Sequence, residues 1–181
     1  MCPPSEIQTE EENENGPNET AEPSGLIKIT EISEPDLNDG FLETLDNLIP
    51  GTSLIGGPEA ARTLREIKSN PLHKIFVAKA GRADTNNAEH LTVAGTTTLL
   101  VEPKFIFNGG RFGHIEDVSV RKGFEKLGIG SKLVSHATSV AKEMGCVKVI
   151  LDCSNETMPF YEKLGYTYQD NCMKKVLADQ L

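Results

Sequence analysis

Residues 113–133 place a strand, a glycine-containing loop and the start of a long amphipathic helix in direct succession. The segment GHIEDVSV (113–120) has the composition of a strand. In the helix that follows, apolar residues recur every three or four positions from Ile129 to Met144, and Gly145 stands at the C-terminal cap. An amphipathic helix of this length must cover an apolar surface. The succession therefore predicts an α/β chain in which the helix packs on a sheet.

Hydrophobic periodicity locates the remaining elements. Period-two patterns and β-rich composition predict strands, while apolar residues at helical spacing predict helices from Pro35 to Leu48 and over 59–69. Gly165 is expected to end a short helix over 155–164. The resulting order is β-α-α-β-β-β-α-β-α-β, a central mixed β-sheet flanked by helices on both faces. The predicted strands are 26–32, 73–80, 91–102, 113–120, 147–153, which we expect to be buried, and one or two closing strands within 166–177.

The first 24 residues differ from the rest of the chain. They contain seven Glu, four Pro and no Lys or Arg, and they carry seven of the nine net negative charges. Such a segment has too little apolar surface to offset the entropy of ordering. We therefore expect a disordered acidic tail over 1–24 and one globular domain over 25–181.

The sequence argues against several classes of protein. No apolar run approaches the roughly 20 residues of a membrane span, and the acidic N-terminus resembles neither a signal peptide nor a transit peptide. The acidic balance without a basic patch argues against nucleic acid as a partner. The four cysteines form no CxxC pair and the four histidines have no metal-ligand spacing. We expect a cytoplasmic protein with reduced thiols and no metal, in which Cys146 and Cys153 are small core residues.

The loop before the long helix has the features of a phosphate site. The first turn of a helix has unpaired N–H groups and a positive dipole end. Gly128 and Gly130 would let a phosphate approach those groups, and Lys126 and Lys132 add positive charge. Glycine pairs also make ordinary turns, and this more common explanation stays open on the loop alone.

Two further features carry chemistry. Tyr161 lies on the short helix after a strand, where a phenol can give a proton to a departing thiolate, although it could equally be a core aromatic beside Phe160. Glu116 and Asp117 are neighbours in strand 113–120. Because strand neighbours point to opposite faces, at most one of these carboxylates is expected to face a given cleft, and a solvated edge strand is the alternative.

Together these features resemble the GNAT acyltransferase superfamily. Its signature is a strand, a loop of the form Q/R-x-x-G-x-G/A and a helix, with a tyrosine on a later helix. More narrowly, VEPKFI (101–106), GHIEDVSV, VKVILDC (147–153) and PFYEKLGY (159–166) resemble the glucosamine 6-phosphate N-acetyltransferase family. The resemblance covers about residues 25–177. It implies the GNAT acyl-CoA N-acyltransferase fold, acetyl-CoA as co-substrate, glucosamine 6-phosphate as acceptor, a role in UDP-N-acetylglucosamine biosynthesis, and a homodimer whose C-terminal segment completes the neighbour's sugar site.

The resemblance also implies roles for individual residues. Tyr161, Asp152 and Glu116 would be catalytic. Acetyl-CoA would contact Asp152 and Tyr161 together with Val118, Ser119, Val120, Lys126, Leu127, Gly128, Ile129, Gly130 and Ser131. The sugar phosphate would contact Lys104, Phe105, Ile106, Phe107, Glu116, Asp117, Val118, Val147, Lys148 and Lys175. An amine can attack a thioester directly, so the chemistry requires alignment, oxyanion stabilisation and help for the leaving thiolate.

Four positions depart from the family pattern. Glu125 replaces the usual Gln or Arg of the pyrophosphate loop, Phe107 a His, Ile49 a Thr and Val176 an Arg. Three of these departures concern the sugar or its phosphate. Two alternatives therefore remain: a GNAT enzyme that acetylates a peptide, lysine or polyamine, and a non-catalytic homologue that binds acetyl-CoA.

Overall fold

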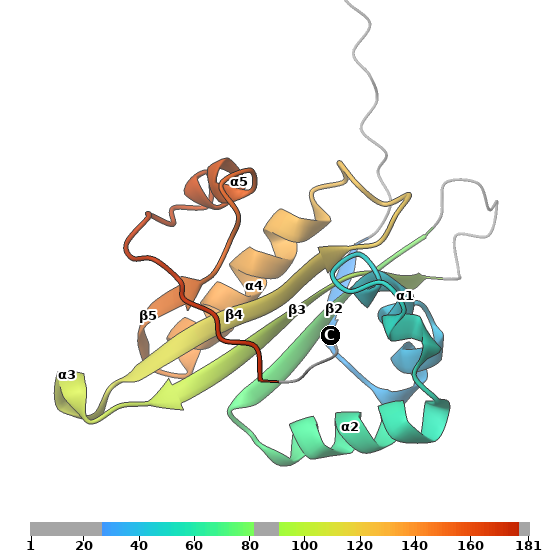
Figure 1. Ribbon diagram of the computed structural model, residues 1–181, viewed down its shortest axis with the longest axis horizontal. Coiled ribbons are helices and arrows are strands. Elements are labelled where there is room, and N and C mark those ends of the chain that lie inside the picture. Colours follow the sequence, from blue (N-terminus) through green and yellow to red (C-terminus); the bar gives the residue numbers. More distant parts are fainter. Residues whose placement is uncertain (1–26, 82–90, 178–181) are drawn as a thin grey trace, which may run out of the picture.

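A computed structural model describes residues 27–81 and 91–177 (Figure 1). The predicted acidic tail over 1–24 and most of the predicted loop 81–90 lie outside this range. The described residues form one five-stranded sheet in which neighbours in sequence are neighbours in space. The first four strands pair antiparallel and β5 pairs parallel to β4, which confirms the mixed sheet. The strands are β1 (Lys28–Glu31), β2 (His73–Ala80), β3 (Thr92–Pro103), β4 (Arg111–Val120) and β5 (Cys146–Leu151).

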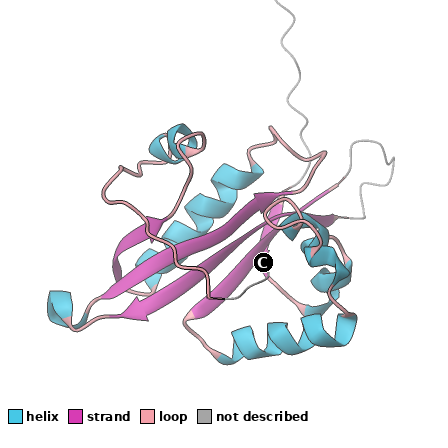
Figure 2. Ribbon diagram, in the orientation of Figure 1, coloured by secondary structure: helices cyan, strands magenta, loops and turns pink. Residues whose placement is uncertain are grey.

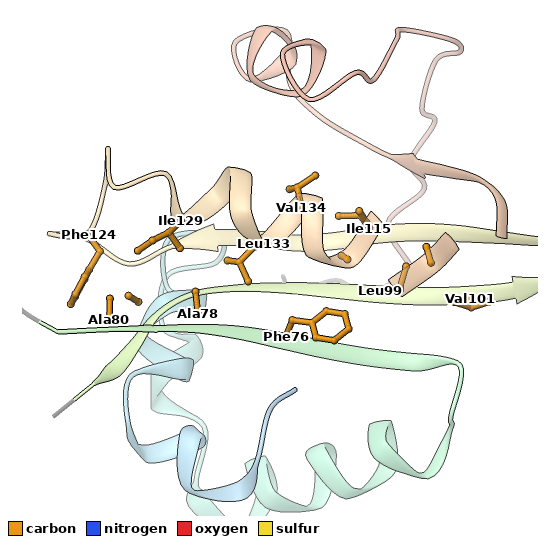
Figure 3. Close-up of a cluster of buried hydrophobic side chains, with 13 residues drawn as sticks. Phe76, Ala78, Ala80, Leu99, Val101, Ile115, Phe124, Ile129, Leu133 and Val134 are labelled. Carbon is orange, nitrogen blue, oxygen red and sulfur yellow. The ribbon is translucent and has the colours of Figure 1, made fainter. Parts of the chain in front are cut away.

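Helices cover both faces of the sheet (Figure 2). On one face lies α4 (Ile129–Glu143), the predicted long helix, whose apolar stripe packs against β2, β3 and β4. Figure 3 shows this layer edge-on, with Leu133 of α4 directed towards the sheet near Ala78 and Val134 beside Ile115. These four side chains are at most 2% exposed, so this cluster is the main hydrophobic core.

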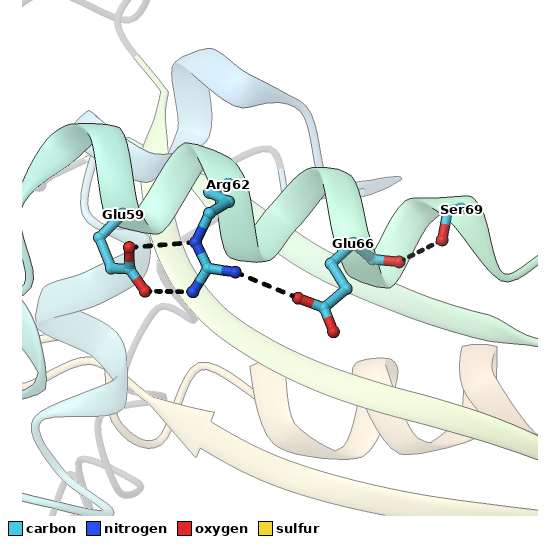
Figure 4. A network of polar contacts seen from close by, with 4 residues as sticks. All are labelled: Glu59, Arg62, Glu66 and Ser69. Carbon is cyan, nitrogen blue, oxygen red and sulfur yellow. Dashed lines mark hydrogen bonds and ion pairs between the residues drawn. The ribbon is translucent and has the colours of Figure 1, made fainter.

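A second core lies on the other face, beneath η1 (Glu34–Asn38), α1 (Phe41–Leu45) and α2 (Gly57–Ser69). The short η2 (Thr52–Leu54) between α1 and α2 has no buried residue. The second core buries Ala60 and Leu64 of α2 against Ile75 and Val77 of β2. The outer side of α2 is polar, and Figure 4 shows Arg62 between Glu59 and Glu66 along it. Exposed ion pairs of this kind contribute little stability, so the apolar side holds α2 in place.

The first predicted helix is interrupted at Gly40. Its φ of 102° is left-handed, which ends η1 and lets α1 start in a new direction. The apolar spacing continued through this break, which is why the sequence predicted one helix. A short α3 (Ile106–Gly109) in the β3–β4 connection was not predicted, and α5 (Met158–Glu162) is shorter than the predicted 155–164. Among the described residues, no helix is long and apolar enough to cross a membrane.

Two predictions about the C-terminal third were wrong. The strand β5 is not buried, because half of its residues are exposed and the rest are only partly covered. Cys153, expected in the core, is likewise exposed, and Cys146 is half-buried. Residues 166–177 form no strand, since within the described residues β5 pairs with β4 alone and this segment is irregular and mostly exposed.

Candidate active site

On the sheet face opposite α4, the part formed by β3, β4 and β5 lies beyond the core beneath α1 and α2, and we call it the open face. Leu100 and Ile150 lie in its middle and are each 37% exposed. The strand registers align three rows of alternating side chains across β3, β4 and β5. The rows are Glu102–Phe112–Lys148, Leu100–His114–Ile150, and Thr98–Glu116 with Asp152 one residue beyond the last β4–β5 pair.

A β-bulge in β4 distorts the third row. Between the pairs Thr96–Ser119 and Thr98–Glu116, β3 has one residue and β4 has two. Asp117, one of these two, has a left-handed φ of 51°. Its Oδ2 accepts a hydrogen bond of 3.3 Å from the Thr98 hydroxyl, which places the carboxylate on the open face beside Glu116. The prediction that only one of the two acids could face the cleft was therefore wrong, because it assumed regular alternation.

Negative charge gathers at this end of the open face. Partial burial, followed by the nearby carboxylates of Asp117 and Asp152, raises the pKa of Glu116. The Oδ2 of Asp152 also accepts a contact of 3.2 Å from the Cys172 thiol, and this interaction raises the pKa of Cys172. Three carboxylates are thus close enough to repel one another, which favours a cation or a protonated amine among them.

Positive charge gathers at the other end of the open face. The Nζ atoms of Lys148 and Lys104 lie 4.4 and 5.2 Å from the centroid of the Phe112 ring. The Phe107 ring also contacts Phe112, at 5.7 Å between centroids. Lys104 forms an ion pair of 2.5 Å with Glu102, which also contacts His114 at 3.1 Å. One aromatic ring therefore holds two ammonium groups, one from β5 and one from the residue after β3, within reach of a common anion.

The β4–β5 pairing stops at Ile115 and Leu151. Beyond these residues, the described part of β4 pairs with β3 but not with β5. The edge of β4 from Val118 to Val120 therefore borders a gap where β4 and β5 no longer pair, although the Val120 carbonyl accepts a hydrogen bond of 2.6 Å from the Asn47 side-chain amide. It can accept an extended amide-containing ligand as an additional strand would be accepted.

Tyr161 lies on the helix side of this gap, in α5. Its ring is 4.9 Å from Phe160 and 6.1 Å from Tyr166. Burial, followed by the Cys153 thiol and Tyr166, raises the pKa of the Tyr161 phenol. The phenol therefore keeps its proton across the neutral range. Tyr161 belongs to the core cluster of α4, so the core and functional interpretations of this residue are compatible.

A cavity of about 840 Å³ joins these parts. It lies between the end of α4, β5, α5 and the segment 164–172, and its lining includes Asp152, Cys153, Tyr161 and Cys172. The carboxylate end of the open face and the phenol thus meet at one cavity. Its volume suits a small organic ligand.

The glycine loop before α4 has the geometry expected of a phosphate site. Gly128 is the N-cap residue with a φ of 71°, and it makes no side-chain cap to the first-turn N–H groups of this 15-residue helix. A Cβ at Gly130 would lie 3.4 Å from the Phe160 ring, an ordinary van der Waals contact, so the first turn of α4 packs close to α5. The Glu125 carboxylate accepts a hydrogen bond of 2.7 Å from the Gly123 N–H, two residues earlier in the loop. The loop residues therefore fit the pyrophosphate of a coenzyme A.

The structure brings together most of the predicted site residues, but not all of them. The side chain of Phe105 is fully exposed at the tip of the β3–β4 connection, and Ile106 is 57% exposed beside it. Val147 is also exposed, and Lys175 is exposed in the C-terminal segment. Sequence reasoning missed three residues of the open face, because their place depends on the register between strands. They are Thr98, Phe112 and His114.

The fold, the glycine loop and the gap beside β4 define a class: the chain is an acetyltransferase of the GNAT family, whose sequence profile matches residues 43–166. It is 37% identical over 150 residues to a glucosamine 6-phosphate N-acetyltransferase of Arabidopsis thaliana, covering 82% of this chain and 95% of the relative. It is 39% identical over 149 residues to the Trypanosoma brucei brucei protein of the same name, covering 82% and 94%. Within GNAT, the chain belongs to the glucosamine 6-phosphate N-acetyltransferase family.

Comparison of structures agrees with this assignment. The crystal structure of glucosamine-6-phosphate N-acetyltransferase from Arabidopsis thaliana superposes with a TM-score of 0.74 at 35% identity, covering 84% of this chain and 99% of that one. A Trypanosoma brucei acetyltransferase superposes with a TM-score of 0.72 at 30% identity, covering 83% and 99%. The predicted GNAT fold is thereby confirmed.

Proposed function

We propose that this protein transfers an acetyl group from acetyl-CoA to the amine of glucosamine 6-phosphate. The observation that carries the proposal is the polarity of the open face. Carboxylates of Glu116, Asp117 and Asp152 lie at one end, and Lys104 and Lys148 lie at the other. Asp152, the residue after β5, is four residues from Lys148, or about 13 Å of extended chain. An acceptor with an amine at one end and a phosphate at the other matches this arrangement, because the long lysine side chains can extend towards the carboxylates and shorten this separation.

The residues around the gap would hold acetyl-CoA, which supplies an acetyl group activated as a thioester. The first-turn N–H groups of α4 and the Gly128–Gly130 loop would bind its pyrophosphate. The free edge of β4 from Val118 to Val120 would pair with the amides of its pantetheine arm. Glu125 places a carboxylate in this loop, but its bond to Gly123 holds that carboxylate against the loop backbone.

The chain's own groups account for the proton movements of transfer. An acceptor amine on the open face approaches between Glu116 and Asp152, which receive the proton that it loses on forming the new C–N bond. Tyr161 holds a proton on Oη for the sulfur when the C–S bond breaks, and its raised pKa keeps that proton available. A hexosamine amine is less basic than a lysine amine, so much of it is neutral near pH 7.

The wider assignments belong to this proposal as well. We infer a cytoplasmic enzyme that supplies N-acetylglucosamine 6-phosphate for UDP-N-acetylglucosamine synthesis without a metal. We also infer a homodimer in which Lys175 and its neighbours reach the partner's sugar site. Exposed apolar side chains in the C-terminal segment support that inference, because Met173 is 95% exposed and Leu177 is 89% exposed.

The test follows free thiol release from acetyl-CoA with four parallel acceptors: glucosamine 6-phosphate, glucosamine, spermidine and a peptide amine. We expect release with the phosphorylated sugar at a lower KM than with glucosamine. Lys148→Met should raise the KM for glucosamine 6-phosphate by about tenfold and leave that for glucosamine unchanged. Lys28→Met, an exposed lysine of β1, is the matched control.

Two outcomes would contradict the proposal. Faster turnover of spermidine or the peptide would favour a GNAT enzyme with another acceptor. Acetyl-CoA binding without release to any acceptor would favour a non-catalytic homologue.

A further inference from the structure

Asp117 adopts a backbone conformation that an L-residue other than glycine rarely takes. Its φ of 51° lies in the left-handed region, where Asp and Asn are tolerated better than most other side chains but still at some cost in free energy. It lies within strand β4, where β4 still pairs with β3 but no longer with β5. Such a conformation persists only where surrounding contacts determine it.

Three consecutive threonines of β3 lie directly across the bulge, and all three are at most 6% exposed. Each hydroxyl has a different acceptor. Thr96 donates to the Phe76 carbonyl at 3.1 Å, on the side of β2 and away from the bulge. Thr97 donates to the Glu116 carbonyl at 3.4 Å, and Thr98 donates to the Asp117 carboxylate at 3.3 Å. Two of the three threonines thus bond to Glu116, which borders the bulge, and to Asp117, which is one of its two residues.

We propose that Thr98 is a positioning residue: its hydroxyl, bonded to Asp117, fixes the β4 bulge that brings two carboxylates to the acceptor and turns the following peptide groups towards the thioester. The inference deepens the proposed acetyl transfer and rests on it. Without the hydroxyl, the Asp117 carboxylate loses its neutral donor within the sheet. It is then free to leave the left-handed conformation, because the Thr98 hydroxyl is its side chain's one hydrogen-bond partner among the residues that the structure describes.

This role differs from that of a general structural residue. Regular pairing in place of the bulge would move Asp117 to the opposite face of the sheet, since strand neighbours alternate. The third row would then keep Glu116 but lose Asp117, and the peptide groups from Val118 onwards would change direction. Binding of the acetyl-CoA pyrophosphate through the glycine loop does not depend on this geometry, whereas the pantetheine contacts and the transfer step do.

The test compares three variants of the full chain. Thr98→Val has nearly the same shape without the hydroxyl, Thr98→Ser keeps the hydroxyl, and Thr96→Val removes a hydroxyl of the same run that bonds elsewhere. We expect Thr98→Val to lower kcat by about 10- to 100-fold, the scale of a misplaced reacting group. The KM for acetyl-CoA should rise by less than kcat falls, because the glycine loop still binds the pyrophosphate while the contacts of Val118 to Val120 with the pantetheine arm weaken. Thr98→Ser should restore kcat, and Thr96→Val should leave it unchanged.

A second readout needs no acceptor. Backbone NMR shifts of Asp117 and Val118 in isotope-labelled protein report φ directly, and they should change in Thr98→Val and return in Thr98→Ser. Unchanged shifts in Thr98→Val, or a Thr98→Ser variant that fails to recover them, overturn the inference whatever the enzyme acetylates. Failure of the wild type to acetylate glucosamine 6-phosphate contradicts the proposed function instead, and the NMR comparison still decides the role of Thr98.

Discussion

The hydroxyl groups of Tyr166 and Thr138 lie 2.8 Å apart. Thr138 is in the third turn of α4, and its Oγ1 also donates to the Val134 carbonyl at 2.8 Å. The Tyr166 N–H in turn donates to the Tyr161 carbonyl at 3.1 Å. This chain of contacts joins the main helix to the segment after α5, and it fixes the position of Tyr161 from behind.

Tyr166→Phe should lower the free energy of unfolding by about 1 kcal/mol, the usual contribution of one partly buried hydrogen bond. Urea denaturation followed by circular dichroism measures it. Thr138→Val should cost a similar amount, and the double variant should cost less than the sum because both remove the same bond. Fully additive losses would show that the two hydroxyls do not interact.

Tyr161→Phe should lower kcat by about 100-fold or more, because the phenolic proton that neutralises the leaving thiolate is lost. Tyr166→Phe is the matched control, since it removes a phenol 6.1 Å away whose hydroxyl faces Thr138. Burial raises the pKa of Tyr161, so the wild-type rate should show no loss from this group up to about pH 9. A Tyr161→Phe enzyme of normal kcat would exclude the phenol as the proton donor.

Removing the charge of Glu116 should raise the stability of the protein near neutral pH and lower its acetyl-transfer rate. Its pKa is raised in the folded state, so the folded protein binds the proton more tightly than the unfolded chain. The resulting stabilisation is complete below the unfolded pKa of about 4.3 and is lost as pH rises through the folded pKa. At pH 7.5, Glu116→Gln should therefore melt at a higher temperature than the wild type. At pH 4 this difference in melting temperature should be smaller. The acetyl-transfer rate of the variant should fall.

The measurement for Glu116→Gln is a pair of melting curves at the two pH values, with thiol release assayed at pH 7.5. The control variant Glu143→Gln, at the exposed end of α4, should change neither the melting temperature nor the rate of thiol release. A Glu116→Gln variant that is less stable than wild type at pH 7.5 would contradict the repulsion among the three carboxylates.

Glu125→Gln should tighten acetyl-CoA binding about two- to fivefold. The change removes a negative charge near the N-terminus of α4, which repels a pyrophosphate by about 0.3–1 kcal/mol. The amide oxygen can still accept the bond from the Gly123 N–H, so the loop should keep its shape. Isothermal titration calorimetry at low and high salt checks this, with a smaller gain expected at high salt. Unchanged or weaker affinity would show that the Gly123 contact already offsets the charge.

The fold was largely predictable because its signals are local. Strand 73–80 was predicted with its exact limits, and the helix from Ile129 was ended correctly at Gly145, whose φ is 79°. The break at Gly40 was missed because Leu37 and Phe41 keep helical spacing across a residue that is left-handed. The strand predicted within 166–177 failed because alternation indicates only that a segment could pair, and pairing also requires a neighbouring strand edge.

The site was predictable in its residue types but not in its arrangement. Tyr161, Asp152 and the glycine loop follow from motifs in the sequence. The grouping of Lys104 and Lys148 on Phe112 depends on which residue of β3 lies opposite which residue of β4, and a sequence does not state that register. The bulge at Asp117 is a departure from regular pairing, so a rule based on alternation could only place that residue on the wrong face.

The end of the β4–β5 pairing at Ile115 and Leu151 makes one part of this protein robust to mutation. Beyond that point β4 offers peptide groups, which are the same whatever side chains they carry. Most substitutions at Val118 or Val120 leave these groups in place, whereas proline would delete a donor. The lysine pair and the carboxylates have no such protection, because each depends on one side chain. Natural substitutions in this enzyme should therefore change its acceptor specificity more readily than its affinity for acetyl-CoA.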